Sequence, residues 1–291
     1  MDWIKYRPIY FLVSALVIGV GIFSYFRWGF LVGVDFKGGS AVEYKFENKI
    51  STEDAVFKIE ESGFDVNSIQ EIGENSYLIK LAEINIEDKE RLSNSLSPLG
   101  NKEELRFESV GPSFGPELVK KTIYAMLVAA ISILVWVAYQ FRSIKFGASA
   151  ILAMLHDSLV LFGIFSLLSH FFGAEIDFLF VTAMLTTLSF SVHDTIVVYD
   201  RVRELQKKVG GSINEIANAA ISQTMVRSLN NSFTIVFMLV ALILLGGSTI
   251  RWFIAALLVG TISGTYSSPF VAVPLLVTWD EIQRNIKPSD E

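Results

Sequence analysis

Cysteine is absent from this 291-residue sequence, which excludes disulfide bonds and thiolate metal sites. Histidine is scarce, and the three residues at positions 156, 170 and 193 do not follow a zinc-type spacing. The sequence also lacks a glycine-rich phosphate loop, a Ser-His-Asp order in a suitable setting, and the arginine and aromatic stripe that binds nucleic acid. We therefore expect no metal, no cofactor, no nucleic-acid partner and no enzymatic activity.

Charge is missing from four long stretches of the chain. No Asp, Glu, Lys or Arg occurs in residues 8–26, 122–141, 228–250 and 252–279. A helix needs about 20 apolar residues to cross the hydrocarbon core of a bilayer. Two further stretches, 146–172 and 178–199, are apolar apart from a few ionisable side chains. Together these stretches predict an α-helical integral membrane protein with six transmembrane helices.

Lysine and arginine favour one orientation of these spans. Placing both termini in the cytoplasm puts eleven Lys and Arg residues at the inner ends of the spans and five at the outer ends. Cytoplasmic flanks carry such an excess of positive charge. Arg27 and the pair Lys120 and Lys121 oppose this orientation. The first apolar stretch is longer than the core of a signal peptide, so we expect it to remain as a span.

Residues 30–118 differ sharply from the rest of the chain. They hold nine Lys and Arg against 18 Asp and Glu, a net charge of −9, whereas the remainder carries +3. The segment is too apolar and too patterned to be disordered. Its strand and helix patterns follow the order β-α-β-β-α-β, with Ser51 and Asn85 as helix-capping residues. This order predicts an external ferredoxin-like α+β domain between the first and second spans.

The predicted organisation has four parts. They are the N-terminus with the first span (1–29), the external domain (30–118), spans two to six (119–280) and a cytoplasmic C-terminal tail (281–291). Residues 200–227 are expected to form a cytoplasmic loop, in which Ser212 caps a helix that lies along the membrane surface. The turn-rich segment Gly111–Pro116 is expected to be a hinge that leads into the second span.

Asp194 is the sharpest candidate for a functional residue. A charge inside a bilayer costs about 3 kcal/mol on insertion scales, so ionisable residues in spans are often functional. Helical spacing places Asp194 on one polar stripe with Thr187 and Ser191. A carboxyl group there can bind and release a proton as helices rearrange. The alternative interpretation is that Asp194 belongs to an interfacial cluster with Asp200 and Arg201.

Polar residues also open the fifth span. Arg227 is followed closely by Asn230 and Asn231, and such side chains need partners in lipid, so we expect them to face the helix bundle. Arg227 is either a partner of Asp194 that regulates its protonation or an ordinary positive anchor at the inner interface. Charge rules taken alone favour the anchor.

The third span carries the neighbouring pair His156 and Asp157. This pair either extends a proton relay or accepts hydrogen bonds from the polar stripe of the fourth span; alternatively, it is a structural contact between two helices. His193 lies beside Asp194 in sequence but points about 100° away around a helix, which favours a packing or interface role. His170 is expected at the outer interface.

Several motifs, taken in order, resemble a known family. Gly33-Val-Asp-Phe-Lys-Gly-Gly39 follows the first span, and Gly111-Pro-Ser-Phe-Gly115 precedes the second. Later motifs are Leu155-His-Asp157, Asp194-Thr-Ile-Val-Val-Tyr-Asp-Arg-Val-Arg-Glu204, Arg227-Ser-Leu-Asn-Asn-Ser232 and Gly264-Thr-Tyr-Ser-Ser268. The combination is similar to SecF, the smaller subunit of the SecD–SecF protein-export complex, and covers essentially the whole chain.

The resemblance implies half of an RND-type transporter in the cytoplasmic membrane, in contact with membrane lipid. Its implied partners are a SecD-like subunit that supplies the other half, a SecYEG-type channel and a translocating unfolded polypeptide, with export driven by the proton gradient. The resemblance also implies that Asp194 and Arg227 conduct protons. It assigns Gly33, Asp35, Gly38 and Gly39 to the motif that leads into the external domain.

One departure from the family concerns the residue before Asp194. The family usually has Asn there, and this chain has His193. Under this hypothesis, His193 shifts the pH at which Asp194 exchanges protons or carries a second proton. The runner-up function is a small-molecule or lipid exporter half of the same superfamily, although such exporters usually join two six-span halves in one chain. An intramembrane hydrolase would need paired aspartates or a zinc motif that the sequence lacks.

Overall fold

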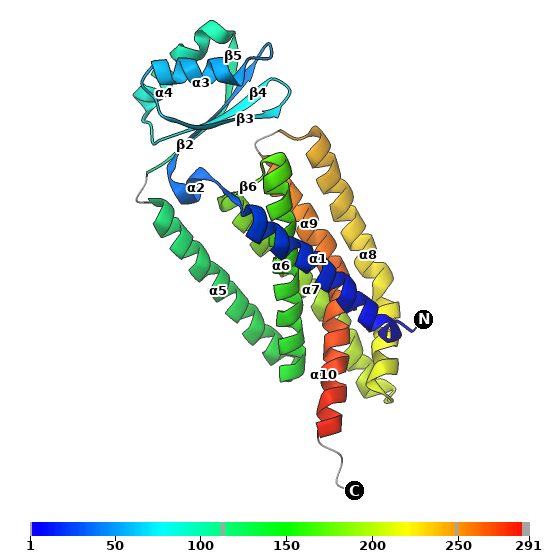
Figure 1. Cartoon of the computed structure of the whole chain (residues 1–291). Helices are drawn as coiled ribbons and strands as arrows, with labels where there is room; N and C mark the ends of the chain where they lie inside the picture. The colour runs from blue at the N-terminus through cyan, green and yellow to red at the C-terminus, as the bar shows by residue number, and fades with distance from the viewer. Residues whose placement is uncertain (1, 112–113, 248–249, 287–291) are drawn as a thin grey trace.

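The computed structural model describes residues 2–111, 114–247 and 250–286. A helical bundle lies at one end of the molecule and a small α/β domain at the other (Figure 1). The predicted hinge Gly111–Pro116 includes residues 112 and 113, which lie outside the described residues. Below, the end of the bundle nearest the α/β domain is called its outer end, and the opposite end its inner end.

Six helical segments within the described ranges are long and apolar enough to cross a membrane, which confirms the six predicted spans. They are α1 (Arg7–Trp28, after the short η1 at Ile4–Tyr6), α5 (Phe114–Phe141), α6 (Ile144–Phe172), α7 (Phe178–Lys208), α8 (Ile213–Leu245) and a sixth span made of α9 (Arg251–Ser267), the π-helical η4 (Ser268–Ala272) and α10 (Val273–Ile286). The second span therefore begins within the predicted domain 30–118, and helix continues into the predicted tail 281–291.

The prediction for residues 200–227 was wrong. The segment is not a loop with a separate surface helix, because α7 continues to Lys208 and α8 begins at Ile213. Ser212 does cap a helix, through a capping box with Glu215, but that helix runs on without a break into the fifth span. Buried apolar residues such as Ile216, Ala220 and Ile221 pack this inner part of α8 against the bundle.

The external domain has the predicted order β2-α3-β3-β4-α4-β5. Its elements are β2 (Gly39–Phe46), α3 (Thr52–Glu61), β3 (Val66–Gly73), β4 (Ser76–Leu81), α4 (Ile86–Leu96), η2 (Ser97–Leu99) and β5 (Lys102–Val110). The antiparallel sheet has the strand order β3-β4-β2-β5, which is compatible with the predicted ferredoxin-like arrangement. Ser51 and Asn85 cap α3 and α4 as predicted. The domain core lies between the sheet and these two helices and includes Tyr44 and Ile79.

A second, two-stranded sheet joins the domain to the bundle. Strand β1 (Leu31–Val32) pairs in parallel with β6 (Glu175–Ile176), the segment that leads into α7. The one-turn helix α2 (Val34–Lys37) follows β1 and begins the external domain (Figure 1). Through this pairing, the chain that enters the domain is held beside the N-terminus of the fourth span.

Candidate functional site

Asp157 lies at the centre of a hydrogen-bonded cluster that joins three spans. Its side chain is 4% exposed. Oδ2 accepts hydrogen bonds from Ser191 of α7 at 2.5 Å and Ser267 of α9 at 2.7 Å. Oδ1 accepts from Ser263 of α9 at 2.6 Å and lies 3.1 Å from Nδ1 of His156. A carboxyl group has about four acceptor positions; three are filled by hydroxyl donors, and the His156 ring lies beside the fourth.

Small residues bring these helices close enough for the cluster to form. A Cβ atom on Gly264 would lie 2.8 Å from Cβ of Ser191, and one on Gly260 would lie 2.5 Å from the side chain of Thr187. Both distances are shorter than real Cβ contacts, so α9 reaches α7 only because these positions lack side chains. Glycine thus sets the helix separation that allows Ser263 and Ser267 to reach Asp157.

His156 extends the cluster to the first span. Its Nε2 atom lies 2.9 Å from Oγ of Ser14 in α1, and its Nδ1 atom faces Asp157. Two of the interpretations of this pair agree with the structure. Asp157 accepts a hydrogen bond from the polar stripe of α7, and its hydrogen bonds also connect α6 with α7 and α9. The residues of the predicted polar stripe have different hydrogen-bond partners. Ser191 donates to Asp157, whereas the Thr187 hydroxyl donates to the backbone carbonyl of Met184 in its own helix.

Asp194 has a different environment, although it is equally buried at 4% exposure. In the described ranges of the chain, the side chain that hydrogen bonds to it is Ser228 of α8, which donates to Oδ2. The neighbouring hydroxyl of Thr195 is engaged instead with Ser268 of η4, at 2.9 Å. Most acceptor positions of Asp194 are thus left without a protein donor among the residues that the structure describes.

Arg227, Asn230 and Asn231 do not face the bundle, contrary to the prediction. All three are exposed in this chain, whereas Ser228 and Ser232 on the opposite face of α8 are buried. The helical period explains the division, because residues 227, 230 and 231 share one face and 228 and 232 share another. Arg227 also forms no ion pair with Asp194 or with any other residue in the described ranges.

A hollow separates the inner parts of α7 and α8. It has a volume of about 890 Å³ and is lined by Val197, Asp200, Arg201, Arg203, Glu204, Lys207, Gln223, Thr224 and Arg227. Val197 lies about one helical turn beyond Asp194, and Arg227 directly precedes Ser228. The hollow therefore reaches from the inner end of the bundle toward the one partner of Asp194 described above.

His193 is exposed, and it lies on a different side of α7 from the buried Asp194. No hydrogen bond joins the two side chains within the described residues. This position fits the predicted interface role better than a direct part in the hydrogen bonding of Asp194. His170, at the outer end of α6, stacks on Trp28 with ring centroids 4.3 Å apart.

The motif that leads into the external domain forms a rigid junction. Gly33 donates its N–H to the Ile176 carbonyl, and Oδ2 of Asp35 accepts the N–H of Phe178, the first residue of α7. Gly38 and Gly39 have φ angles of 78° and 111°, which side chains rarely tolerate. Asp35 therefore attaches this motif to the N-terminus of the helix that carries Asp194.

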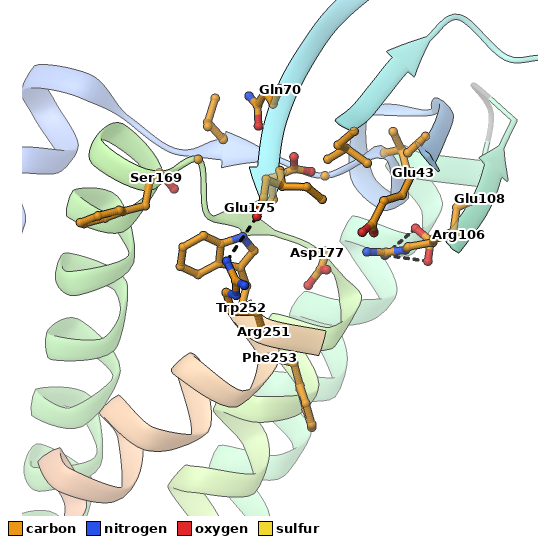
Figure 2. A pocket seen from close by; sticks show the side chains of 18 of the residues that line it. Glu43, Gln70, Arg106, Glu108, Ser169, Glu175, Asp177, Arg251, Trp252 and Phe253 are labelled. Carbon is orange, nitrogen blue, oxygen red and sulfur yellow. Dashed lines mark hydrogen bonds and ion pairs between the residues drawn. The ribbon is translucent and has the colours of Figure 1, made fainter. Parts of the chain in front are cut away.

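Figure 2 shows a cavity of about 650 Å³ between the domain and the outer end of the bundle. Glu43 of β2 lines this cavity and is only 1% exposed, because the bundle covers this face of the sheet. Arg106 pairs with Glu108 at 2.6 Å, and Asp177 points toward them (Figure 2). Burial raises the pKa of the Asp177 carboxyl above its usual value of 3.8, and the nearby Asp35 adds to the rise.

An ion pair and a hydrogen bond also connect the external domain to the outer end of the bundle. Lys80 of β4 forms an ion pair with Glu175 of β6. Nη1 of Arg251 donates to the Ile72 carbonyl at 3.3 Å (Figure 2). Neither contact could be predicted from a sequence pattern, because each joins residues that are far apart in the chain.

Six spans that surround buried carboxyl groups, with one external α/β domain, define a polytopic membrane protein of transport type. Residues 90–282 match the family model for "Protein export membrane protein SecD/SecF, C-terminal". The chain is 42% identical to the protein translocase subunit SecF of Thermobaculum terrenum, over 96% of this chain and 94% of that protein. It is 31% identical to the protein translocase subunit SecDF of Bacillus subtilis, over 96% of this chain but only 38% of that protein.

The fold agrees with these similarities. The chain matches the crystal structure of SecDF, a translocon-associated membrane protein from Thermus thermophilus, with a TM-score of 0.86 and 32% sequence identity. The match covers 97% of this chain and 39% of the SecDF chain. The chain belongs to the SecD/SecF protein-export family and corresponds to its SecF members.

Proposed function

We propose that this chain is the SecF subunit of a protein translocase and uses the proton gradient to promote the export of unfolded polypeptides. The names of its relatives, all protein translocase subunits, support a role in transport rather than catalysis. In this proposal the chain lies in the cytoplasmic membrane with both termini in the cytoplasm. It works with a SecD-like subunit and a SecYEG-type channel.

The observation that carries the proton role is the contrast between burial and partners at Asp194. The carboxyl group is 4% exposed, yet its one described hydrogen-bond partner is Ser228, beside a hollow that opens at the inner end of the bundle. A carboxyl group with vacant acceptor positions can exchange a proton without breaking a network of fixed bonds. Water in the hollow supplies the route from the inner side in this proposal.

Arg227 acts in the proposal as the positive charge that controls this exchange. Its side chain lines the hollow, and it has no anionic partner within the described part of the chain. Exposed Asn230 and Asn231 lie on the same face of α8, and unpaired polar groups at this depth are costly in lipid. This chain spans 39% of the SecDF chain that it matches, so in this proposal a SecD-like half packs against the exposed polar face of α8.

Coupling to the external domain passes through the N-terminus of α7. Asp35 accepts the N–H of Phe178, β1 pairs with β6, and Lys80 pairs with Glu175. A shift of α7 on protonation of Asp194 would therefore move the base of the external domain, where an emerging polypeptide is held in this proposal. The alternative of a small-molecule or lipid exporter half is not favoured, because relatives that match nearly the full chain are named protein translocase subunits.

The test is the isosteric variant Asp194→Asn in membrane vesicles that contain the complete translocase. We expect normal assembly with the partner subunits but loss of the stimulation of preprotein translocation by a proton gradient. Asp65→Asn, the same chemical change at an exposed residue of the external domain, is the matched control and should behave as wild type. Full proton-dependent stimulation in the Asp194 variant would refute the relay.

A further inference from the structure

The sixth span is not one continuous α-helix. α9 ends at Ser267, a π-helical turn covers Ser268–Ala272, and α10 begins at Val273 (orange and red in Figure 1). Proline explains the interruption, because Pro269 and Pro274 have no N–H group for the carbonyl four residues earlier. In a π-turn a carbonyl meets the N–H five residues later instead, so the hydrogen-bond ladder can pass over Pro274. Such turns inside α-helices are frequent at functional sites.

Side chains of α7 hold both ends of this π-helical turn. At its first residue, the hydroxyl of Ser268 lies 2.9 Å from that of Thr195 and donates to the Ser191 carbonyl at 3.2 Å. At its last residue, the Ala272 carbonyl accepts from the hydroxyl of Tyr199 at 3.1 Å. Thr195 and Tyr199 are one helical turn apart on the same face of α7. The shape of the sixth span at this level is therefore set by α7 as well as by its own ladder.

The hydroxyl of Tyr199 is fixed from several directions. The residue is fully buried, and its hydroxyl oxygen lies 2.6 Å from that of Ser149 in α6. Its ring meets the rings of Phe141 and Phe146 edge to face, with centroids 5.8 Å and 5.0 Å apart. A ring held in this way moves with α6 and α7, so its bond to Ala272 transmits a movement of these helices to the sixth span.

Two ion pairs at the inner end depend on where α10 lies. Asp280 pairs with Lys145 of α6 at 2.6 Å, and Glu281 pairs with Arg7 of α1 at 2.7 Å. The four side chains are 17–31% exposed, and partly exposed pairs of this kind contribute little to stability. The inner ends of three spans are thus joined by contacts that can separate if α10 changes its direction.

We propose that Ser268–Ala272 is a hinge in the sixth span and that Tyr199 is the positioning residue through which α7 controls it. A movement of α7 that breaks the bond from Tyr199 to Ala272 frees α10 to swing away from α1 and α6 at the inner end. Thr195 directly follows Asp194, so the hinge carries a movement of α7 at the relay to the inner ends of the bundle. This last step rests on the proposed function, whereas the hinge itself does not.

Distances between spin labels in the full-length chain test the hinge. The chain has no cysteine, so labels can be placed at chosen positions alone. One label replaces Val209, just after α7, and the other replaces Ile282 of α10; both residues are exposed. Tyr199→Phe keeps the ring and removes the hydroxyl. We expect it to broaden the distance distribution and add a second population, measured by double electron–electron resonance in lipid nanodiscs.

Two controls separate a hinge from general loosening. Tyr124→Phe makes the same change at an exposed tyrosine of α5 and should leave the distribution as in wild type. A second label pair, at Phe237 of α8 and Ile262 of α9, lies on the outer side of the hinge and should not respond to Tyr199→Phe. An unchanged inner pair, or equal broadening of both pairs, would overturn the proposal.

The same inner label pair in Asp194→Asn measures the link to the relay. We expect its distance to shift while the outer pair stays unchanged. No shift in this variant, together with broadening in Tyr199→Phe, would support the hinge and reject its control by Asp194. Because this measurement uses no proton gradient, failure of the hinge is also distinct from failure of the relay, which the translocation assay on vesicles detects.

Discussion

Two carboxyl groups, Asp157 and Asp194, are buried in the bundle to the same extent but have opposite hydrogen-bonding environments. Each is 4% exposed. Three hydroxyls from α7 and α9 and the neighbouring His156 of α6 surround Asp157. Asp194 has one described partner, Ser228, and a hollow nearby. Burial alone therefore does not distinguish the two residues; the number of hydrogen-bond donors and the nearby hollow do.

The difference follows from position within the bundle. Asp157 lies where α6 crosses α7 and α9, and the glycines of α9 allow three serines to converge on it. Asp194 lies two helical turns or less from the inner hollow, on the side of α7 that faces α8. A carboxyl group whose acceptor positions are filled from several helices holds those helices together, whereas one with vacant positions does so less.

The largest effect on stability is expected from Asp157→Leu. This substitution removes the acceptor of three hydroxyl donors, and each buried donor left without a partner costs about 1–3 kcal/mol. We expect a loss of at least about 3 kcal/mol, which allows for partial satisfaction by backbone carbonyls. The readout is the melting temperature of the purified chain in one detergent.

Asp194→Leu is the control for that experiment, because it removes an equally buried carboxyl group but leaves only one described hydroxyl, that of Ser228, without its acceptor. We expect it to lower stability by only about 1 kcal/mol. Equal losses in the two variants would show that the cluster around Asp157 is no more structural than the site of Asp194, and the comparison would fail.

A substitution in α9 tests the separation of the helices instead of the carboxyl group. Gly264→Ala places a Cβ 2.8 Å from Cβ of Ser191, so α9 must shift away from α7 and from Asp157. Overpacking of this kind costs about 1–3 kcal/mol. Gly19→Ala in α1 is the matched control, because its Cβ would meet no atom within 4 Å. The melting temperature should fall for Gly264→Ala alone, and a fall of the same size in both would contradict the packing argument.

The sequence predicted the fold well wherever a periodic pattern carried the information. Apolar runs with little or no charge located all six spans, and alternating residues with capping Ser51 and Asn85 located the external domain. These features depend on local chemistry, which sequence displays directly. The error at 200–227 arose because charged residues were taken to end a span, whereas α7 and α8 extend as helices beyond their apolar parts.

The site was only partly predictable, because its geometry depends on rotation and on distant contacts. Spacing identified Asp194, Ser191 and Asp157, but it did not show that Ser191 bonds to Asp157 rather than serving Asp194. Arg227 was expected to face inward, and helix rotation places it outward. The sequence does not single out Ser263 and Ser267 as partners of Asp157, since close helix packing and hydrogen bonding favour the same small residue types.

A third carboxyl group, Asp177, extends the comparison to the outer end of the bundle. Burial raises the pKa of Asp177, so its charged form is less favourable in the folded state than in the unfolded state. The stability that it contributes is present below its usual pKa of 3.8 and is lost as pH rises through the folded value. Asn also caps helices, so Asp177→Asn keeps the N-cap of α7 without the charge.

We therefore expect Asp177→Asn to melt at a slightly higher temperature than wild type at neutral pH. The gap should close as pH falls toward 3.8. Melting curves across this range measure it, with Asp65→Asn as an exposed control that shows no such gap. A variant that is less stable than wild type at neutral pH would show that Asp177 is held as a favourable anion.

The smallest effect is expected from His193→Asn, which introduces the residue that the family resemblance implies at this position. His193 is exposed and makes no described hydrogen bond with Asp194, so any influence acts through space. Histidine can carry a positive charge and asparagine cannot, so we expect the variant to change the pH profile of translocation slightly. Proton-driven translocation measured across pH tests this, with expression and melting temperature unchanged. An identical pH profile would leave Asp194 as the sole titrating group of the proposed relay, and the contrast with Asp157 would then rest on one residue alone.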